Sequence, residues 1–131
     1  MQEALRFRPA APFSQFMTVK RPVTLGKYSF EPGDIMCIMF EGLAHDPSQW
    51  QRPSEFLPQR FDNSDKLSLT PSGKKRHVNS FVPFHGGSRV CFGKTLAEAQ
   101  IKIMHSYLTQ KFNLEFEKEK YKTEMPFTQI D

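Results

Sequence analysis

Cys91 is the residue with the most evident chemistry in this sequence, and it lies in a glycine-rich stretch, residues 84–93, directly before a helical pattern. Unpaired N–H groups and the dipole at the start of a helix favour negative charge, so the position suits a thiolate. The glycine pair that ends at Gly87 allows backbone angles that other residues rarely adopt, and Gly93 leaves room for a flat, bulky ligand. Arg89 can pair with a carboxylate on the same ligand. The stretch indicates a thiolate that binds a flat, carboxylate-bearing ligand.

Three other interpretations of Cys91 stay open from the residues alone. A lone cysteine is most often a small buried hydrophobe. The stretch also looks like a phosphate-binding P-loop, but that motif has four residues between its glycines, whereas five separate Gly87 from Gly93, and Ser88 stands where the first glycine should be. Finally, Cys91 and His85 would form a nucleophile pair if the fold brought their side chains together.

We predict an amphipathic helix over residues 94–111, directly after this stretch. The segment contains no Pro or Gly, and apolar residues recur at steps of three or four, as on one face of a helix. Glu98 and Lys102, four residues apart in the favourable order, support the same assignment. The predicted apolar face consists of Ala97, Ile101, Met104, Leu108 and Phe112.

The remaining elements predict a mainly α fold with a small antiparallel β-sheet, in the α+β class. Residues 1–8 form a short helical pattern that Pro9 ends. Strand-forming residues continue from 17 to 40, with turn signals at 26–27 and 31–34, and we place Cys37 in the core of that sheet. Residues 112–116 alternate between apolar and polar, which predicts a half-buried strand.

Length and composition exclude several classes of protein. The 131 residues fit one small domain, and a net charge of +4 without a basic stripe interleaved with aromatics argues against nucleic acid as a partner. The two cysteines show no zinc-type spacing, and their low number suits a reducing compartment. The longest apolar run, residues 35–40, is far too short to span a membrane, so we expect no anchor in this chain. No signal peptide is visible.

The stretch around Cys91 resembles the haem-binding loop of the cytochrome P450 family. The family's loop has the pattern Phe, two residues of any kind, Gly, any residue, Arg, any residue, Cys, any residue, Gly. The resemblance implies that Cys91 is the axial thiolate ligand of the iron of haem b, and that Arg89 holds a haem propionate. Such a thiolate pushes electron density onto the iron and favours O–O cleavage. The pattern is filled here by Phe84, Gly87, Arg89, Cys91 and Gly93, with Ala97 where the family usually has Ala.

A second resemblance concerns Glu3 and Arg6, whose spacing matches the Glu-x-x-Arg helix of the same family. Without that resemblance, the pair reads as a surface ion pair. Residues 53–61 match the family pattern Pro, any, Glu, Phe, any, Pro, Glu, Arg, Phe, although Gln59 replaces the usual Glu. The resemblance implies that Arg60 joins Glu3 and Arg6 in a buried structural network.

These landmarks occur in family order over almost the entire chain. The resemblance implies that residues 1–131 are the C-terminal haem-binding portion of a cytochrome P450 domain. Its parent enzyme would insert one atom of O2 into a small apolar organic substrate, with electrons from an NADPH-dependent reductase. It would reside at the cytoplasmic face of the endoplasmic reticulum membrane. We expect this chain alone to be inactive, with no catalytic side chain of its own; the alternative is a non-catalytic haem-binding fragment or pseudoenzyme.

The resemblance also assigns surfaces. Residues 10–16 and 125–128 would line the substrate pocket. Many family members carry an Arg or His for a propionate on the strand after the first helix, but residues 13–17 offer no such charge. Propionate binding would then depend on Arg89 and on groups outside this chain. The basic run at residues 74–77 reads as a solvated loop, or as a landing site for an acidic reductase.

Overall fold

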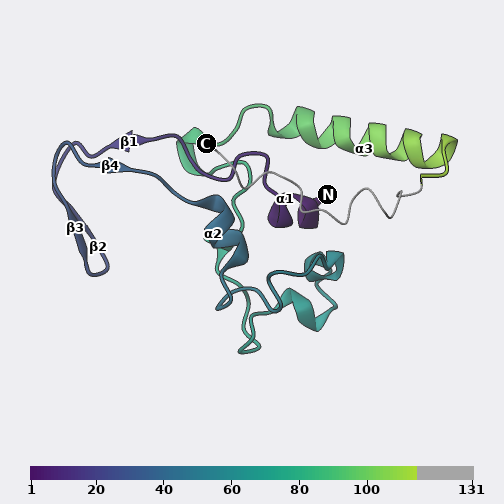
Figure 1. Ribbon diagram of the computed structural model, residues 1–131, viewed down its shortest axis with the longest axis horizontal. Coiled ribbons are helices and arrows are strands. Elements are labelled where there is room, and N and C mark those ends of the chain that lie inside the picture. Colours follow the sequence, from purple (N-terminus) through teal and green to yellow (C-terminus); the bar gives the residue numbers. More distant parts are fainter. Residues whose placement is uncertain (115–131) are drawn as a thin grey trace, which may run out of the picture. The chain divides into compact units, whose positions relative to one another are not determined.

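The computed structural model describes residues 1–114, and the chain divides into two compact units, one over Met1–Phe92 and one beginning at Gly93. The described part of the second unit contains α3 (Lys94–Lys111), while the other elements belong to the first unit (Figure 1). The helices of the first unit are α1 (Gln2–Phe7) and α2 (Phe40–His45), with the short 3-10 helices η1 (Pro58–Phe61), η2 (Lys66–Ser68), η3 (Val78–Ser80) and η4 (Gly87–Arg89).

The strands of the first unit pair as two antiparallel ribbons, which confirms the predicted small antiparallel sheet. The turn signals fall where chain reversal requires them, because Gly26 and Gly33 have φ of +60° and +103°, in a region that side chains rarely adopt. One ribbon pairs β1 (Met17–Thr18) with β4 (Ile35–Met36), and the other pairs β2 (Val23–Leu25) with β3 (Tyr28–Phe30). In Figure 1 the ribbon of β2 and β3 is a hairpin that extends from the ribbon of β1 and β4, away from α2.

The core of the first unit lies where α1 packs against α2 and η1. Trp50 is its centre, with 1% of its surface exposed, and its ring packs beside Phe61 and Phe81 at centroid distances of 5.9 and 6.1 Å. The indole N–H donates a hydrogen bond to the carbonyl of Leu43 at 3.1 Å, so the polar end of the ring is also satisfied. The tryptophan thereby anchors the proline-rich stretch on which it lies.

Two predictions for the end of the strand region are wrong. Phe40 begins α2 instead of ending a strand, because Phe40 and Ala44 lie one turn apart and are both buried on one helix face. Cys37 is exposed rather than in a core, since it follows a two-stranded ribbon. Its thiol donates to the Ser14 carbonyl at 3.3 Å.

Helix α3 has the predicted bounds, but its apolar face is exposed. None of its residues is buried, and Met104 in the middle of the predicted face is 62% exposed. The helix ends at Lys111 with Phe112 as its C-cap, and residues 112–114 form no strand. Residues 115–116 and the proposed pocket turn at 125–128 lie outside the described residues. Among residues 1–114, no helix is long and apolar enough to cross a membrane.

Candidate functional site

The loop that carries Cys91 is closed by its own backbone. The N–H of Cys91 donates to the carbonyl of Phe84 at 2.8 Å, which brings the two ends of the stretch together. Between them lies the single turn η4, which ends with a bond from the Val90 N–H to the Gly87 carbonyl at 3.3 Å. The cysteine is therefore presented from a defined turn.

Gly87 is the glycine that this turn requires. Its φ of +61° lies in the left-handed region, which costs an ordinary residue about 1–2 kcal/mol. Gly86, by contrast, has an extended backbone with φ −155°. A Cβ added to either glycine would meet no atom within 4 Å, so the requirement at Gly87 is conformational and the space beside the loop is open.

The side chains of the loop that could bind a ligand are exposed. Cys91 is a free, exposed thiol. Arg89 is also exposed and makes no side-chain hydrogen bond or ion pair within residues 1–114, whereas Phe84 is half-buried. Gly93 and Ala97 belong to the second unit, where Gly93 caps α3 and its carbonyl accepts a bond from the Ala97 N–H at 2.9 Å.

This donor set fits a haem. The free thiol of Cys91 could supply a sulfur ligand, the exposed guanidinium of Arg89 could receive a propionate, and the open space at the glycines would allow close approach of a flat ring. The described residues contain no group of three or more His, Cys, Asp or Glu side chains that could hold a metal ion. No hydrogen bond joins the side chains of Cys91 and His85, both in the described part of the chain, so the nucleophile pair gains no support.

Glu3, Arg6 and Arg60 meet in the core of the first unit. Arg6 donates to both carboxylate oxygens of Glu3, from Nε at 2.8 Å and from Nη2 at 2.9 Å. Arg60 donates from Nε to Oε1 of Glu3 at 3.2 Å, and the Leu57 N–H reaches the same oxygen at 2.8 Å. Glu3 is 2% exposed and both arginines are fully buried. One carboxylate thus joins α1 to the stretch that leads into η1.

Backbone carbonyls satisfy the remaining donors of these arginines. Nη1 of Arg6 donates to the carbonyls of Ala44 and Pro53, each at 2.9 Å. Arg60 donates to the carbonyls of Gln51 and Arg52. The two guanidiniums therefore hold together the end of α2 and the meander at residues 51–55.

The pKa of Glu3 reflects two opposed effects. Burial alone would raise it, but hydrogen bonds from Arg6 and Leu57, together with the charges of Arg6 and Arg60, lower the pKa below its ordinary value of 4.5. The pKa of Arg60 is lowered by burial and then by the positive charge of Arg6, against the attraction of Glu3. Glu3 is therefore held as an anion between two cations.

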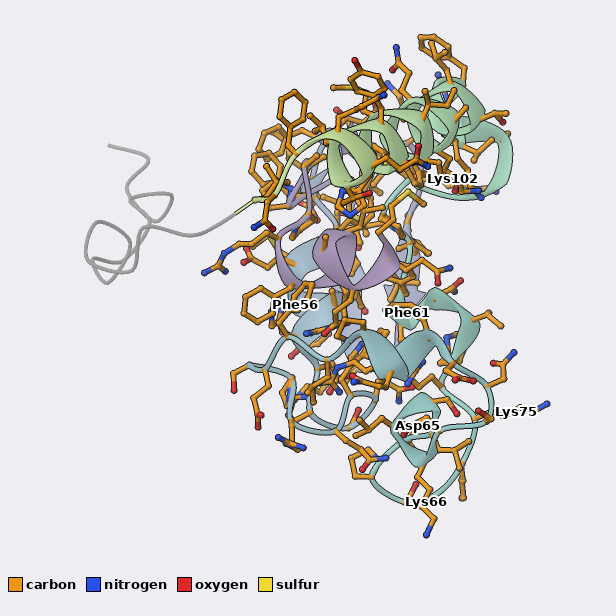
Figure 2. The ribbon with its side chains drawn as sticks, turned by 90° about the vertical axis from the view of Figure 1, so that its right-hand side faces the viewer. Phe56, Phe61, Asp65, Lys66, Lys75 and Lys102 are labelled. Carbon is orange, nitrogen blue, oxygen red and sulfur yellow. The ribbon has the colours of Figure 1, made fainter. Side chains whose placement is uncertain are left out.

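Arg76 is a structural residue that the sequence analysis missed. Lys75 points away from the first unit (Figure 2), and it is exposed together with Lys74 and His77, as predicted for a solvated loop. Arg76 turns inward instead. Its guanidinium lies 4.2 Å from the centre of the Trp50 ring and donates to the carbonyls of Leu67 and Arg60 at 2.8 and 2.7 Å. The only available signal was an arginine within a lysine run, since arginine stacks on aromatic rings better than lysine.

Comparisons with known proteins identify the class to which this fold and loop belong. The sequence profile described as Cytochrome P450 matches residues 1–130. A steroid 17-alpha-hydroxylase/17,20 lyase of Cavia porcellus is 32% identical over 117 residues, which cover 88% of this chain and 22% of that protein. A probable cytochrome P450 of Dictyostelium discoideum is 39% identical over 118 residues, or 86% of this chain and 23% of that protein. A zebra fish cytochrome P450 solved with abiraterone matches with a TM-score of 0.68 and 28% identity, over 86% of this chain and 24% of that one.

The chain therefore belongs to the cytochrome P450 family. Its helices and small antiparallel ribbons form an α+β portion of that fold. The chain spans about a fifth of the length of the curated relatives that it matches.

Proposed function

We propose that this chain is the haem-binding portion of a haem-thiolate monooxygenase, with Cys91 as the axial ligand of haem b. The observation that carries the proposal is a free, exposed Cys91 at the end of a turn closed on the Phe84 carbonyl. Family membership supports the same assignment. A bound haem with a thiolate ligand supplies the oxygen chemistry of such enzymes.

The residues of this chain would bind and orient the haem. Cys91 contributes the sulfur, and Arg89 receives a propionate. Gly87 permits the turn, Phe84 holds the loop closed through its carbonyl, and Gly93 with Ala97 begins the helix that follows. The network of Glu3, Arg6 and Arg60 has a positioning role, because it fixes α1, α2 and the meander as one body.

The whole enzyme would use O2, a small apolar organic substrate and an NADPH-dependent reductase. The relative of Cavia porcellus is named for hydroxylation of steroids, which supports an apolar substrate. Residues 10–16 of this chain would contribute to the substrate pocket, and Phe16, 72% exposed, offers an apolar surface for the substrate. Lys74 and Lys75 are exposed and would face an acidic reductase. We place the parent enzyme at the cytoplasmic face of the endoplasmic reticulum membrane.

Carbon monoxide spectroscopy tests the haem assignment directly. The purified chain is mixed with haem, reduced and exposed to carbon monoxide, and the Soret band is recorded. We expect the red-shifted band of a thiolate complex, lost in Cys91→Ser and retained in Cys37→Ser. Cys37 is the matched control because it is also a free, exposed cysteine. A red-shifted band that survives in Cys91→Ser would contradict the assignment.

The alternative is a non-catalytic haem-binding fragment or pseudoenzyme. The exposure of Cys91 and of the Phe16 side chain favours this alternative for the isolated 131 residues. It predicts the same carbon monoxide spectrum without O2-dependent turnover, so an activity assay separates the two.

A further inference from the structure

His85 adopts a backbone conformation that is unusual for a residue with a side chain. Its φ is +64°, in the left-handed region, and it lies next to Phe84, whose carbonyl closes the Cys91 loop. Only a few per cent of non-glycine residues have positive φ, although His is enriched among them. Such a conformation persists only where surrounding contacts hold it in place. The N–H of His85 provides one such contact, because it donates to the Val82 carbonyl at 3.0 Å.

The imidazole ring provides a second contact. It packs edge-to-face against the ring of Phe40, with centroids 5.2 Å apart and an angle of 83° between the planes. Phe40 is only 7% exposed and is the first residue of α2, so the contact ties the loop to the core of the first unit. Aromatic pairs of this geometry add stability beyond that of their buried area.

The ring nitrogen does not explain why His85 is held there. Nε2 is buried and has no hydrogen-bond partner within residues 1–114. A buried polar atom without a partner is unfavourable, so the contact of the ring with Phe40, rather than a hydrogen bond, fixes its position.

We propose that His85 is a positioning residue for Cys91. Its ring, held on Phe40, fixes the left-handed turn that aims the Phe84 carbonyl at the Cys91 N–H. The link runs from α2 through two aromatic rings and one peptide to the backbone of the cysteine. The functional meaning rests on the proposed haem function, but the link itself is a property of the chain without a ligand.

Amide hydrogen exchange of the haem-free chain tests this link. The exchange rate of the Cys91 N–H reports the opening of its bond to Phe84. We expect His85→Asn to speed exchange about three- to tenfold, because Asn tolerates positive φ but lacks the ring contact. His85→Phe keeps a ring on Phe40 and removes the buried nitrogen, so it should speed exchange less than His85→Asn does, although Phe tolerates positive φ less well than Asn. The Asp62 N–H, bonded to the Gln59 carbonyl at 2.9 Å, is the reference amide and should not change.

Phe40→Leu provides the second half of a double-mutant cycle, since it removes the same ring pair from the other side. We expect the double variant with His85→Asn to exchange no faster than the faster single variant. An unchanged exchange rate of the Cys91 N–H in His85→Asn would overturn the proposal, as would an equal increase of that rate in His85→Phe and His85→Asn. Fully additive effects of His85→Asn and Phe40→Leu on the free energy of opening would also overturn it.

The haem-loaded chain gives the functional readout. We expect His85→Asn to lower the share of the thiolate-type Soret band in the carbon monoxide complex, and His85→Phe to preserve it. If the native chain gives no such band, the proposed function fails while the exchange experiment still decides the role of His85. A native band that His85→Asn leaves unchanged would overturn the positioning role alone.

Discussion

At the scale of single residues, the charge balance around Glu3 predicts that a neutral isostere will not replace this carboxylate without a loss of stability. Two fully buried guanidiniums, those of Arg6 and Arg60, donate to it directly. A third, that of Arg76, is close enough for the charges of Arg60, Glu3 and Arg6 to influence its pKa, which is lowered first by burial and then by Arg60. Glu3 is thus the anion that makes burial of these cations tolerable.

Replacement of Glu3 by Gln should therefore destabilise the first unit strongly. Removal of one partner of a buried ion pair costs about 3–5 kcal/mol, because it leaves a buried charge uncompensated. The free energy of unfolding from urea titration measures the loss. Glu41→Gln is the control, since Glu41 lies 3.9 Å from Arg8 in an exposed pair and should change stability by at most about 0.5 kcal/mol. Equal effects of the two substitutions would contradict the role of Glu3.

The lowered pKa of Glu3 also predicts how stability depends on pH. The folded pKa lies below the ordinary value of 4.5, so the unfolded chain binds the proton more readily than the folded chain. The stabilisation by Glu3 is complete above about pH 4.5 and is lost as pH falls through the folded pKa. The pKa values of Glu55 and Asp62 are also lowered, by hydrogen bonds from Arg52 and Ser64 respectively. Because these two groups also make stability fall in acid, the native chain is compared with Glu3→Gln. The free energy of unfolding of Glu3→Gln should fall less steeply as the pH is lowered. Parallel curves of unfolding free energy against pH for the two proteins would contradict the prediction.

Gly87 allows a matched test of the turn that presents Cys91. Gly87→Ala forces a methyl group into a backbone with φ +61° and should cost about 1–2 kcal/mol locally. Gly86→Ala should be mild, because Gly86 is extended and both positions are sterically open. The measurement is the share of thiolate-type Soret band after carbon monoxide binding, which we expect to fall only in Gly87→Ala. A larger loss in Gly86→Ala would show that space, not φ, limits the turn.

At the scale of elements, Arg76 reinforces the contacts among η1, η2 and Trp50 in the first unit. Its two hydrogen bonds reach η2 at Leu67 and η1 at Arg60, while its guanidinium lies over Trp50. Arg76→Lys keeps the charge but loses the planar stack and one of the two donor directions, so we expect a loss of about 1–3 kcal/mol. Unfolding followed by the fluorescence of Trp50, the single tryptophan, measures it. Lys75→Arg is the control, and an equal effect there would contradict the prediction.

The elements that the sequence predicted well are those set by local signals. Helix α3 has an uninterrupted apolar period between Gly93 and Phe112, and the turns at Gly26 and Gly33 need left-handed backbone, so their positions follow from neighbouring residues. Helix α2 was missed because its six residues are too few to establish an apolar period. Its helical state depends on burial of Phe40 and Ala44 against the rest of the unit.

In the candidate site, too, the features set by local spacing could be predicted from the sequence, and the contacts between distant residues could not. The spacing of Phe84, Gly87 and Cys91 is local, so the sequence alone indicated the loop and its ligand chemistry. The inward turn of Arg76 and the contact of His85 with Phe40 connect residues far apart in the sequence. No periodic pattern records such contacts, since they depend on which rings the fold brings together.

At the scale of the whole molecule, the exposed apolar surface is the main feature to explain. Besides the face of α3, the side chains of Phe16 and Ile35 in the first unit are 72% and 71% exposed. Monomeric soluble proteins rarely leave large contiguous apolar patches uncovered. The relatives are more than four times longer than the matched region, so they contain further chain that would cover equivalent surfaces.

This exposure leads to the prediction that the isolated chain binds haem without turning over O2. Oxygen insertion requires a closed, water-excluding pocket around the substrate, and here both Cys91 and the aromatic side chain of Phe16 are open to solvent. We expect the 131-residue chain, loaded with haem and supplied with NADPH and a reductase, to form no oxidised product detectable by mass spectrometry above the level of Cys91→Ser. The thiolate-type band recorded on the same sample ensures that the result concerns turnover and not haem binding. Product formation that depends on Cys91 would mean that the chain encloses a working pocket by itself, and the non-catalytic reading would then be wrong.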